Sequence, residues 1–350
     1  MAVEVSTAAA ATADPHASSP PAGSRRGGGL GRFIGYRLLA GAGTVVFVLL
    51  FNFFLFRMLP GDPAARYRGV KSISSEDLAR IREDLSSPLA EQFVTYLRDP
   101  LALNGISSWK GEPVWDLVSG RAWPTLVLLG ATTVIAVVIG LWIGIKAGWD
   151  RGGRFDKVST GVTLLFYATP EFWLGLLLIM TFSSGIGPFP SLFPSGGVID
   201  SGVEVLSLDG VRSIAEHTVL PASALAAVYL AEYSLIMRAS IVDELGQDYL
   251  MTARAKGLMD RAVRRHHAVP NASLPTITLI FLNIGFIIGG AITIETVFSY
   301  PGLGLLTFEA VSEQDYVLMQ ALFLVFTLSV IVSNIIADVV IAMMDPRIRT

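Results

Sequence analysis

The sequence predicts an all-α membrane protein with six transmembrane helices. Of its 350 residues, 52% are hydrophobic and 16% charged, and the mean hydropathy is +0.57. These values are typical of polytopic membrane proteins and exclude a soluble globular domain. Six apolar stretches are also long enough to cross a hydrocarbon core about 30 Å thick. They are residues 35–57, 122–146, 159–183, 218–237, 275–298 and 318–343.

The first segment of the chain, residues 1–31, is rich in Ala, Ser, Pro and Gly. Such a composition cannot bury enough apolar surface to fold, so we interpret it as a disordered cytoplasmic tail. The apolar segment that follows is too long for the hydrophobic region of a signal peptide, and no small-residue cleavage site comes after it. We therefore expect residues 32–57 to be retained as the first transmembrane helix.

The distribution of Lys and Arg predicts the orientation, because cytoplasmic loops carry the excess of these residues. Basic residues precede the first span, surround the second loop, fill loop 239–274 and end the chain at 344–350. The third loop carries only Arg212, and loop 299–317 carries no Lys or Arg. Both termini and loop 239–274 are therefore expected to be cytoplasmic, in a multi-pass protein of the plasma or inner membrane.

Residues 58–120 are expected to form a small extracytoplasmic helical region, followed by a transmembrane core of five helices over 121–343. Ser74 with Asp77 resembles a capping box, and Ser87-Pro88 can start a helix. Apolar residues recur at the helical spacing after this second start. They are Leu89, Phe93 and Leu97.

The long cytoplasmic loop contains start and stop signals for two short helices. Asp248 can N-cap a helix over Tyr249–Lys256, which Gly257 can end in a left-handed conformation. Asp260 can cap a second helix, and Pro270 is expected to end it. The first helix would be roughly 12 Å long, too short to be stable alone, so something must hold it.

Small residues among the charges favour a docking role for this loop. Ala253, Ala255 and Gly257 would leave a nearly bare helix surface, better suited to contact with a partner than to solvation. The alternative is a basic loop that is simply solvated.

Four carboxylates lie within the predicted spans: Glu171, Glu232, Glu295 and Asp338. A charge in the bilayer core is costly, so these side chains should face protein or a water-filled cavity. For Glu171, which follows a proline, a cavity-lining role and an interhelical hydrogen bond are both open. Glu295 and Asp338 lie near helix ends, which favours a structural role. Glu171, Glu232 and Glu295 are the candidates for the translocation path.

Glycines repeat at four-residue spacing in two spans, at Gly140, Gly144 and Gly148 and again at Gly285 and Gly289. This spacing allows close approach of membrane helices. Chance is the alternative in a chain with 34 glycines.

Several chemistries have no support in the sequence. There is no P-loop motif, so the chain is not expected to hydrolyse ATP itself. We expect no metal site, because the four histidines form no ligand pair, and no nucleic-acid binding at a net charge of −3. The histidines are His16, His217, His266 and His267.

The segment TARAKG (Thr252 to Gly257), with His267-Ala268, Asn271-Ala272 and Leu274-Pro275 after it, resembles the cytoplasmic coupling motif of ABC importer permeases. It is most similar to the B-type permeases of the peptide and nickel family. Other blocks agree with this resemblance, which covers the chain from about residue 32 onward. They are FRMLPGDPA (56–64), PEFWLGLLLI (170–179), ETVFSYPGLG (295–304) and MMDPRIR (343–349).

The resemblance implies a type I ABC importer permease that moves oligopeptides or dipeptides by alternating access. It implies four kinds of partner: a homologous second permease, two ATPase domains that bind ATP and Mg, an extracytoplasmic substrate-binding protein, and the bilayer. The coupling helix would contact an ATPase. Its residues would be Asp248, Tyr249, Thr252, Ala253, Arg254, Ala255, Lys256 and Gly257.

Two departures and one alternative remain. Pro270 stands where the family usually has a basic residue, and Glu232-Tyr233-Ser234 stands where an Arg is common. The family pattern also covers nickel, haem and glutathione importers. The alternative from a different class is a secondary transporter or channel that uses Glu171 and Glu232 as a relay.

Overall fold

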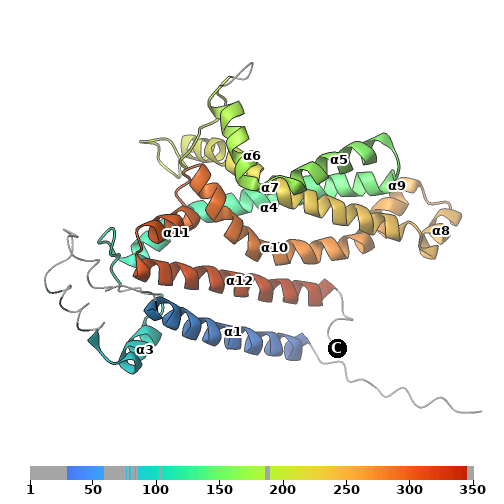
Figure 1. The fold of residues 1–350 in the computed structure, drawn as a ribbon. Coiled ribbons are helices and arrows are strands. Elements are labelled where there is room, and N and C mark those ends of the chain that lie inside the picture. The colour runs from blue at the N-terminus through green and yellow to red at the C-terminus, as the bar shows by residue number, and fades with distance from the viewer. Residues whose placement is uncertain are drawn as a thin grey trace, which may run out of the picture.

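A computed structural model describes residues 30–58, 86–101, 105–185 and 190–344, together with the single positions 76, 79 and 83. These residues form an α-helical protein (Figure 1). The only β-structure within them is an isolated bridge between Ile106 and Pro113. The predicted tail lies outside the described residues except for its last two positions, which already belong to the first helix. The predicted capping box at Ser74 and Asp77 also lies outside them.

Long helices occur at five of the six predicted spans. They are α1 (Leu30–Met58), α4 (Val114–Trp149), α7 (Leu208–Glu244), α10 (Val269–Val297) and α12 (Tyr316–Met344). Within the described ranges, five helical segments are long and apolar enough to cross a membrane, or six if a bent pair counts as one span. With the bent pair counted as one span, the prediction of six spans is confirmed. Helix α4 begins eight residues before its predicted start at residue 122.

The bent pair is the third predicted span. Helix α5 (Arg154–Ala168) ends before Pro170, and α6 (Glu171–Leu178) with the π-helical turn η2 (Ile179–Ser183) continues at an angle of 104°. The residue before a proline is driven out of the helical region. Accordingly Thr169 has φ −90° and ψ 127°, an extended conformation. The span is thus a broken helix rather than the single rod that hydropathy suggests.

The glycine repeat of α4 packs directly against α7. A Cβ atom added at Gly140, Gly144 or Gly148 would lie within 2.8 Å of a backbone oxygen of α7. The three oxygens belong to Leu230, Ser234 and Arg238. Later glycines of α4 meet later residues of α7, so the two helices run in the same direction. The prediction of close helix approach at this repeat is confirmed.

Helices α1 and α12 pack antiparallel to each other, and α12 also packs against α10 (Figure 1). Arg37 and Asp338 form an ion pair of 3.1 Å at one end, and Asn52 Nδ2 donates to the Gln320 carbonyl at 3.0 Å at the other. The predicted structural role of Asp338 is thereby confirmed.

The second glycine pair is packed less tightly. A Cβ atom at Gly285 of α10 would meet Val330 of α12 at an ordinary contact distance of 3.5 Å. The side-chain surroundings of position 289 lie outside the described residues.

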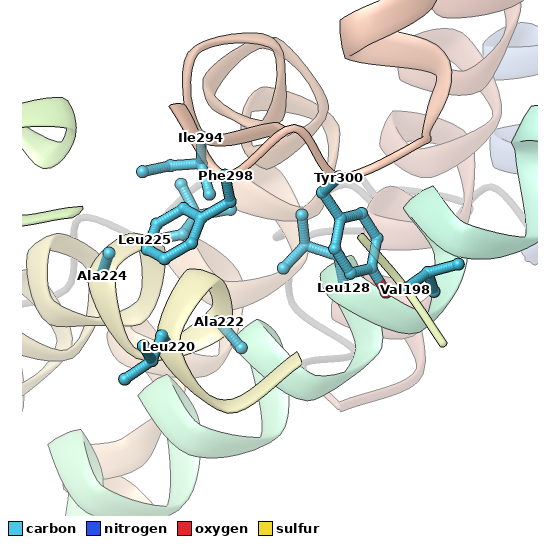
Figure 2. Close-up of a cluster of buried hydrophobic side chains, with 9 residues drawn as sticks. All are labelled: Leu128, Val198, Leu220, Ala222, Ala224, Leu225, Ile294, Phe298 and Tyr300. Atoms are coloured by element: carbon cyan, nitrogen blue, oxygen red, sulfur yellow. The ribbon is translucent and has the colours of Figure 1, made fainter. Parts of the chain in front are cut away.

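A buried apolar cluster joins α4, α7 and the end of α10 (Figure 2). Phe298 and Tyr300, which follow α10, pack there against α7, and the Tyr300 hydroxyl lies 3.2 Å from Thr218 Oγ1. The nine members are Leu128, Val198, Leu220, Ala222, Ala224, Leu225, Ile294, Phe298 and Tyr300.

Helix α3 (Leu89–Arg98) confirms the helix predicted after Ser87-Pro88. It packs on α1 through Phe93 and Tyr96, whose rings lie 5.1 and 5.5 Å from that of Phe53. Leu89 and Leu97 are exposed, so only part of the predicted apolar face is used.

The connection from α7 to α10 consists of α8 (Asp248–Ala255), α9 (Asp260–Val263) and the π-helical turn η3 (Arg264–Ala268). The expectation that Pro270 ends a helix is wrong, because η3 leads directly into α10 with Pro270 in its first turn. A proline ring crowds the carbonyl four residues earlier. The wider π turn just before it gives the ring room.

Candidate functional site

Helix α8, the predicted coupling helix, lies at the end of the bundle where α7 ends and α10 begins (Figure 1). Its predicted stop is confirmed, because Gly257 has φ +83°. Its predicted start needs correction. Asp248 is the first helical residue, and the N-cap is Gln247, which makes no side-chain capping bond. As an acidic residue in the first turn, Asp248 still complements the helix dipole.

One face of α8 packs against the chain itself. Leu250 and Ala253 are buried in a cluster with Val263 of α9 and Ala268 of η3, and Trp149 of α4 packs on this cluster. Ala253 is only 6% exposed. The expectation that it forms part of a bare docking surface is therefore wrong, although Ala255 and Gly257 are exposed as expected.

Tyr249 connects α8 to both neighbouring spans. Its hydroxyl donates to Glu244 at the end of α7, accepts from Asn271 Nδ2 of α10 at 3.0 Å, and lies 3.3 Å from the carbonyl oxygen of His267. Burial, together with the Glu244 carboxylate, raises the pKa of Tyr249 above its usual value. The phenol is therefore protonated at neutral pH and available as a donor.

Trp149, the last residue of α4, holds the second short helix. Its indole Nε1 donates to Asp260 Oδ2 at 2.8 Å, and the Arg254 and Arg264 guanidinium carbons lie 5.8 and 5.9 Å from its ring centre. The predicted capping role of Asp260 is wrong, since the N-cap of α9 is Met259 and makes no side-chain bond. Instead, Asp260 pairs with Arg254 at 3.4 Å.

The other face of α8 and the turn after it are exposed. Met251, Leu258 and Met259 are 63%, 42% and 78% exposed, and Ala255 is also exposed. We call these four residues the docking face. Thr252, Arg254 and Lys256 are exposed beside it. Exposed apolar side chains gathered on one short helix and its turn favour a protein contact surface.

Glu295 is fully buried near the end of α10. Its carboxylate accepts from Thr125 Oγ1 at 2.7 Å and from the backbone N–H groups of Gly304 and Leu305 at 2.7 and 3.0 Å. These amides belong to the first turn of α11 (Leu303–Ser312), whose N-terminal amides lack helical partners. Glu295 thus anchors a helix end, the structural role that its position favours.

The other two candidate carboxylates have different surroundings. Glu232 of α7 accepts from Asn283 Nδ2 of α10 at 2.8 Å. Glu171 is the first residue of α6, directly after the 104° bend, and is partly exposed. A role of these residues in a path remains a prediction. Among the described residues there is no group of three or more His, Cys, Asp or Glu side chains that could hold a metal.

Sequence reasoning missed Trp149 and Glu244, named Asn271 only as part of the motif, and assigned Asp260 a different role. Trp149 and Asp260 are 111 positions apart, so no local pattern could pair them. An aromatic residue near a basic loop is also expected at any membrane interface, which gives it no special signal.

Residues 104–350 match the family described as binding-protein-dependent transport system inner membrane component, and residues 30–109 match the N-terminal part of such components. The chain is similar to a probable peptide ABC transporter permease of Sinorhizobium fredii, with 34% identity over 91% of this chain and 100% of the relative. It is 35% identical to the glutathione transport system permease of Escherichia coli K12 over 89% and 97%. A putative peptide permease of Brucella suis shares 36% over 91% and 99%.

A solved structure of a methionine ABC transporter in an inward-facing conformation shares the fold. The TM-score is 0.51 at 14% identity, and the match covers 65% of this chain and 96% of that one. A likeness at this identity concerns the fold alone. The comparisons give no support to a secondary transporter or channel.

Proposed function

The chain belongs to the family of binding-protein-dependent transport system inner membrane components, and we propose that it is the permease subunit of an ATP-driven peptide importer. It is a multi-pass membrane protein with the type I importer permease fold. The observation that carries the proposal is the two-sided helix α8. One side packs on the chain's own helices, and the other presents the docking face.

The docking face would contact a separate ATPase subunit. The sequence has no P-loop of its own, so ATP and Mg would be bound and hydrolysed by two partner ATPase domains. A homologous second permease would complete the path through the membrane. The family description, which names binding-protein-dependent transport, supports a substrate-binding protein as the partner on the other side.

Peptides are the proposed substrate class, in the size range of dipeptides to oligopeptides. Two relatives are named as peptide permeases and one as a glutathione permease. Glutathione is itself a tripeptide, so the three names agree on peptides as the class of substrate.

We place α8 on the cytoplasmic side. The start of α1 and the end of α12 lie at the same end of the bundle as α8 (Figure 1). This end also carries the basic residues of α8 to η3, and cytoplasmic loops are the ones enriched in Lys and Arg. Both termini would then be cytoplasmic.

The proposed mechanism is mechanical. When the ATPases close on ATP, they would displace the docking face of α8. Because Tyr249 bonds to the ends of both α7 and α10, and Leu250 and Ala253 are buried against the chain, the displacement would reach both spans together. A packed cluster of this kind transmits motion rather than absorbing it. The membrane cavity would then alternate between its two openings.

Co-purification with the ATPases tests the docking face. Ala255→Glu places a carboxylate in the middle of this face, where burial without a partner is costly. His266→Glu is the matched control, because it adds the same group at an exposed position of η3, outside the face. We expect the first variant to lose most of its ATPase subunits and the second to keep them. Full retention by both variants would refute docking at this face.

A further inference from the structure

Trp149, the last residue of α4, lies where five other helical elements meet. It packs on the cluster of α8, α9 and η3, and also on a second cluster that contains Met237 and Ile241 of α7 and Ala272 of α10. A large aromatic ring can contribute substantially to both clusters at once. The end of α4 is therefore part of the surface on which α8 and α9 pack, although α4 is not adjacent to them in sequence. We call α8, α9 and the turn between them the α8–α9 hairpin.

Polar contacts fix the orientation of the indole. Asp260 accepts from Nε1 at 2.8 Å and pairs with Arg254 of α8 at 3.4 Å. Arg254 and Arg264 both lie within 6 Å of the ring centre, the range of cation–π attraction. One side chain of α4 is thus linked to a charged residue on each of α8, α9 and η3.

The end of α4 packs closely against α7. A Cβ atom added at Gly148, one residue before Trp149, would lie 2.8 Å from both the Arg238 carbonyl oxygen and Ile241 Cβ. Backbones packed this closely resist sliding past one another. A displacement of α8 and α9 that moves Trp149 should therefore move the ends of α4 and α7 together.

We propose that Trp149 is a positioning residue for coupling, which fixes the end of α4 to the α8–α9 hairpin so that α4 moves with the docking face. The inference rests on the proposed function, because it concerns how movement of an ATPase reaches the membrane. It adds a third route by which movement reaches the membrane, through α4, beside the two spans α7 and α10 that flank the loop.

The first test measures the ratio of peptide transported to ATP hydrolysed by the complete complex in vesicles. Trp149→Ala should lower this ratio roughly twofold to thirtyfold, the range found for residues that carry coupling between sites. Trp149→Phe retains a ring for packing and cation–π contacts, so it should restore most of the ratio. Trp142→Ala is the matched control, since Trp142 lies in the same helix, is 57% exposed and is not a member of either cluster.

The second test measures a distance and needs no substitution at Trp149. The chain has no cysteine, so labels can be placed specifically at two exposed positions, Arg151 after α4 and Arg261 in α9. If the hairpin and α4 move together, the label distance in the complex with its ATPases should be the same without nucleotide and with trapped ATP. A change of several ångström would overturn the inference, even if Trp149→Ala fails to fold.

The outcomes separate the inference from the function on which it rests. Failure of the unmodified chain to assemble with ATPases would contradict the proposed function. An assembled complex in which Trp149→Ala transports as much peptide per ATP as the unmodified chain would overturn only the role of Trp149.

Discussion

Gly257 ends α8 with a backbone φ of +83°, a region that other L-residues enter at a cost of roughly 1–2 kcal/mol. No other group lies within 4 Å of the place where its Cβ would be. The requirement for glycine is therefore one of backbone conformation and not of space.

Replacing Gly257 with Val should uncouple ATP hydrolysis from peptide uptake, because the turn that positions the docking face becomes strained. Asn tolerates the left-handed region, so Gly257→Asn should retain most of the uptake per ATP. Gly246→Val is the control, since Gly246 lies in the same loop without a positive φ. Equal uptake per ATP in all three variants would show that the turn has no role in coupling.

At this scale, the sequence predicts what depends on a few consecutive residues. The stop at Gly257 needs only one backbone conformation, and the sequence predicted it correctly. The cap at Asp248 was misplaced by one residue, because Asp is favourable both as N-cap and in the first turn. The burial of Ala253 was not predictable, since it depends on Val263, Ala268 and Trp149, which reach it only in the folded chain.

Among the elements, α4 and α7 form the closest pair. The repeat Gly140, Gly144 and Gly148 brings the α7 backbone to within contact distance of α4, and Arg238 of α7 pairs with the buried Asp156 of α5 beside it, with 2.8 Å between Nη2 and Oδ2. The sequence indicated this packing through a spacing of four residues. It did not reveal which helix was the partner, because any backbone could fill that groove.

Gly144→Ala should destabilise the protein by about 1–3 kcal/mol, the usual cost of overpacking. Its Cβ would lie 2.6 Å from the Ser234 carbonyl oxygen and 2.7 Å from Met237 Cβ. Gly130→Ala in the same helix is the control, because no group lies within 4 Å of its Cβ position. Thermal unfolding in detergent measures both variants. A Gly144 variant as stable as the Gly130 variant would refute the packing.

Glu295→Ala should loosen α11, since it removes the acceptor of two backbone N–H groups and of Thr125 Oγ1. Each buried donor left without a partner costs about 1–3 kcal/mol. Amide hydrogen exchange should therefore rise at Gly304 and Leu305. Glu232→Ala removes one bond to a side chain and should leave exchange at α11 unchanged. Protection at α11 that is unaffected by Glu295→Ala would contradict the anchoring role.

The break in the third span shows the limit of prediction for elements. Pro170 marked the position, because it restricts Thr169 to an extended conformation. Hydropathy measures how apolar a segment is and not its direction, so the 104° angle between α5 and α6 was not predictable. At Pro270 a helix end was predicted and none occurs, because η3 accommodates the proline within a continuing helix.

For the whole molecule, the arrangement places the docking face, the start of α1 and the end of α12 at one end of the bundle (Figure 1). The positive-inside rule predicted the same arrangement. It placed both termini and loop 239–274 on one side of the membrane from the Lys and Arg content of the loops alone. Family membership follows from motifs spread over most of the chain, and both the family models and the relatives confirm it. The substrate class has the least direct support, because no pattern in the sequence indicates a specific peptide-binding residue.

Uptake of a labelled short peptide into vesicles that contain the complete complex tests the central claim most directly. The vesicles are supplied with a binding protein on one side and ATP on the other. We predict uptake only when both are present, and its loss in the Ala255→Glu variant. Uptake by this chain alone, without ATP and driven by an ion gradient, would contradict the account and favour the alternative of a relay through Glu171 and Glu232.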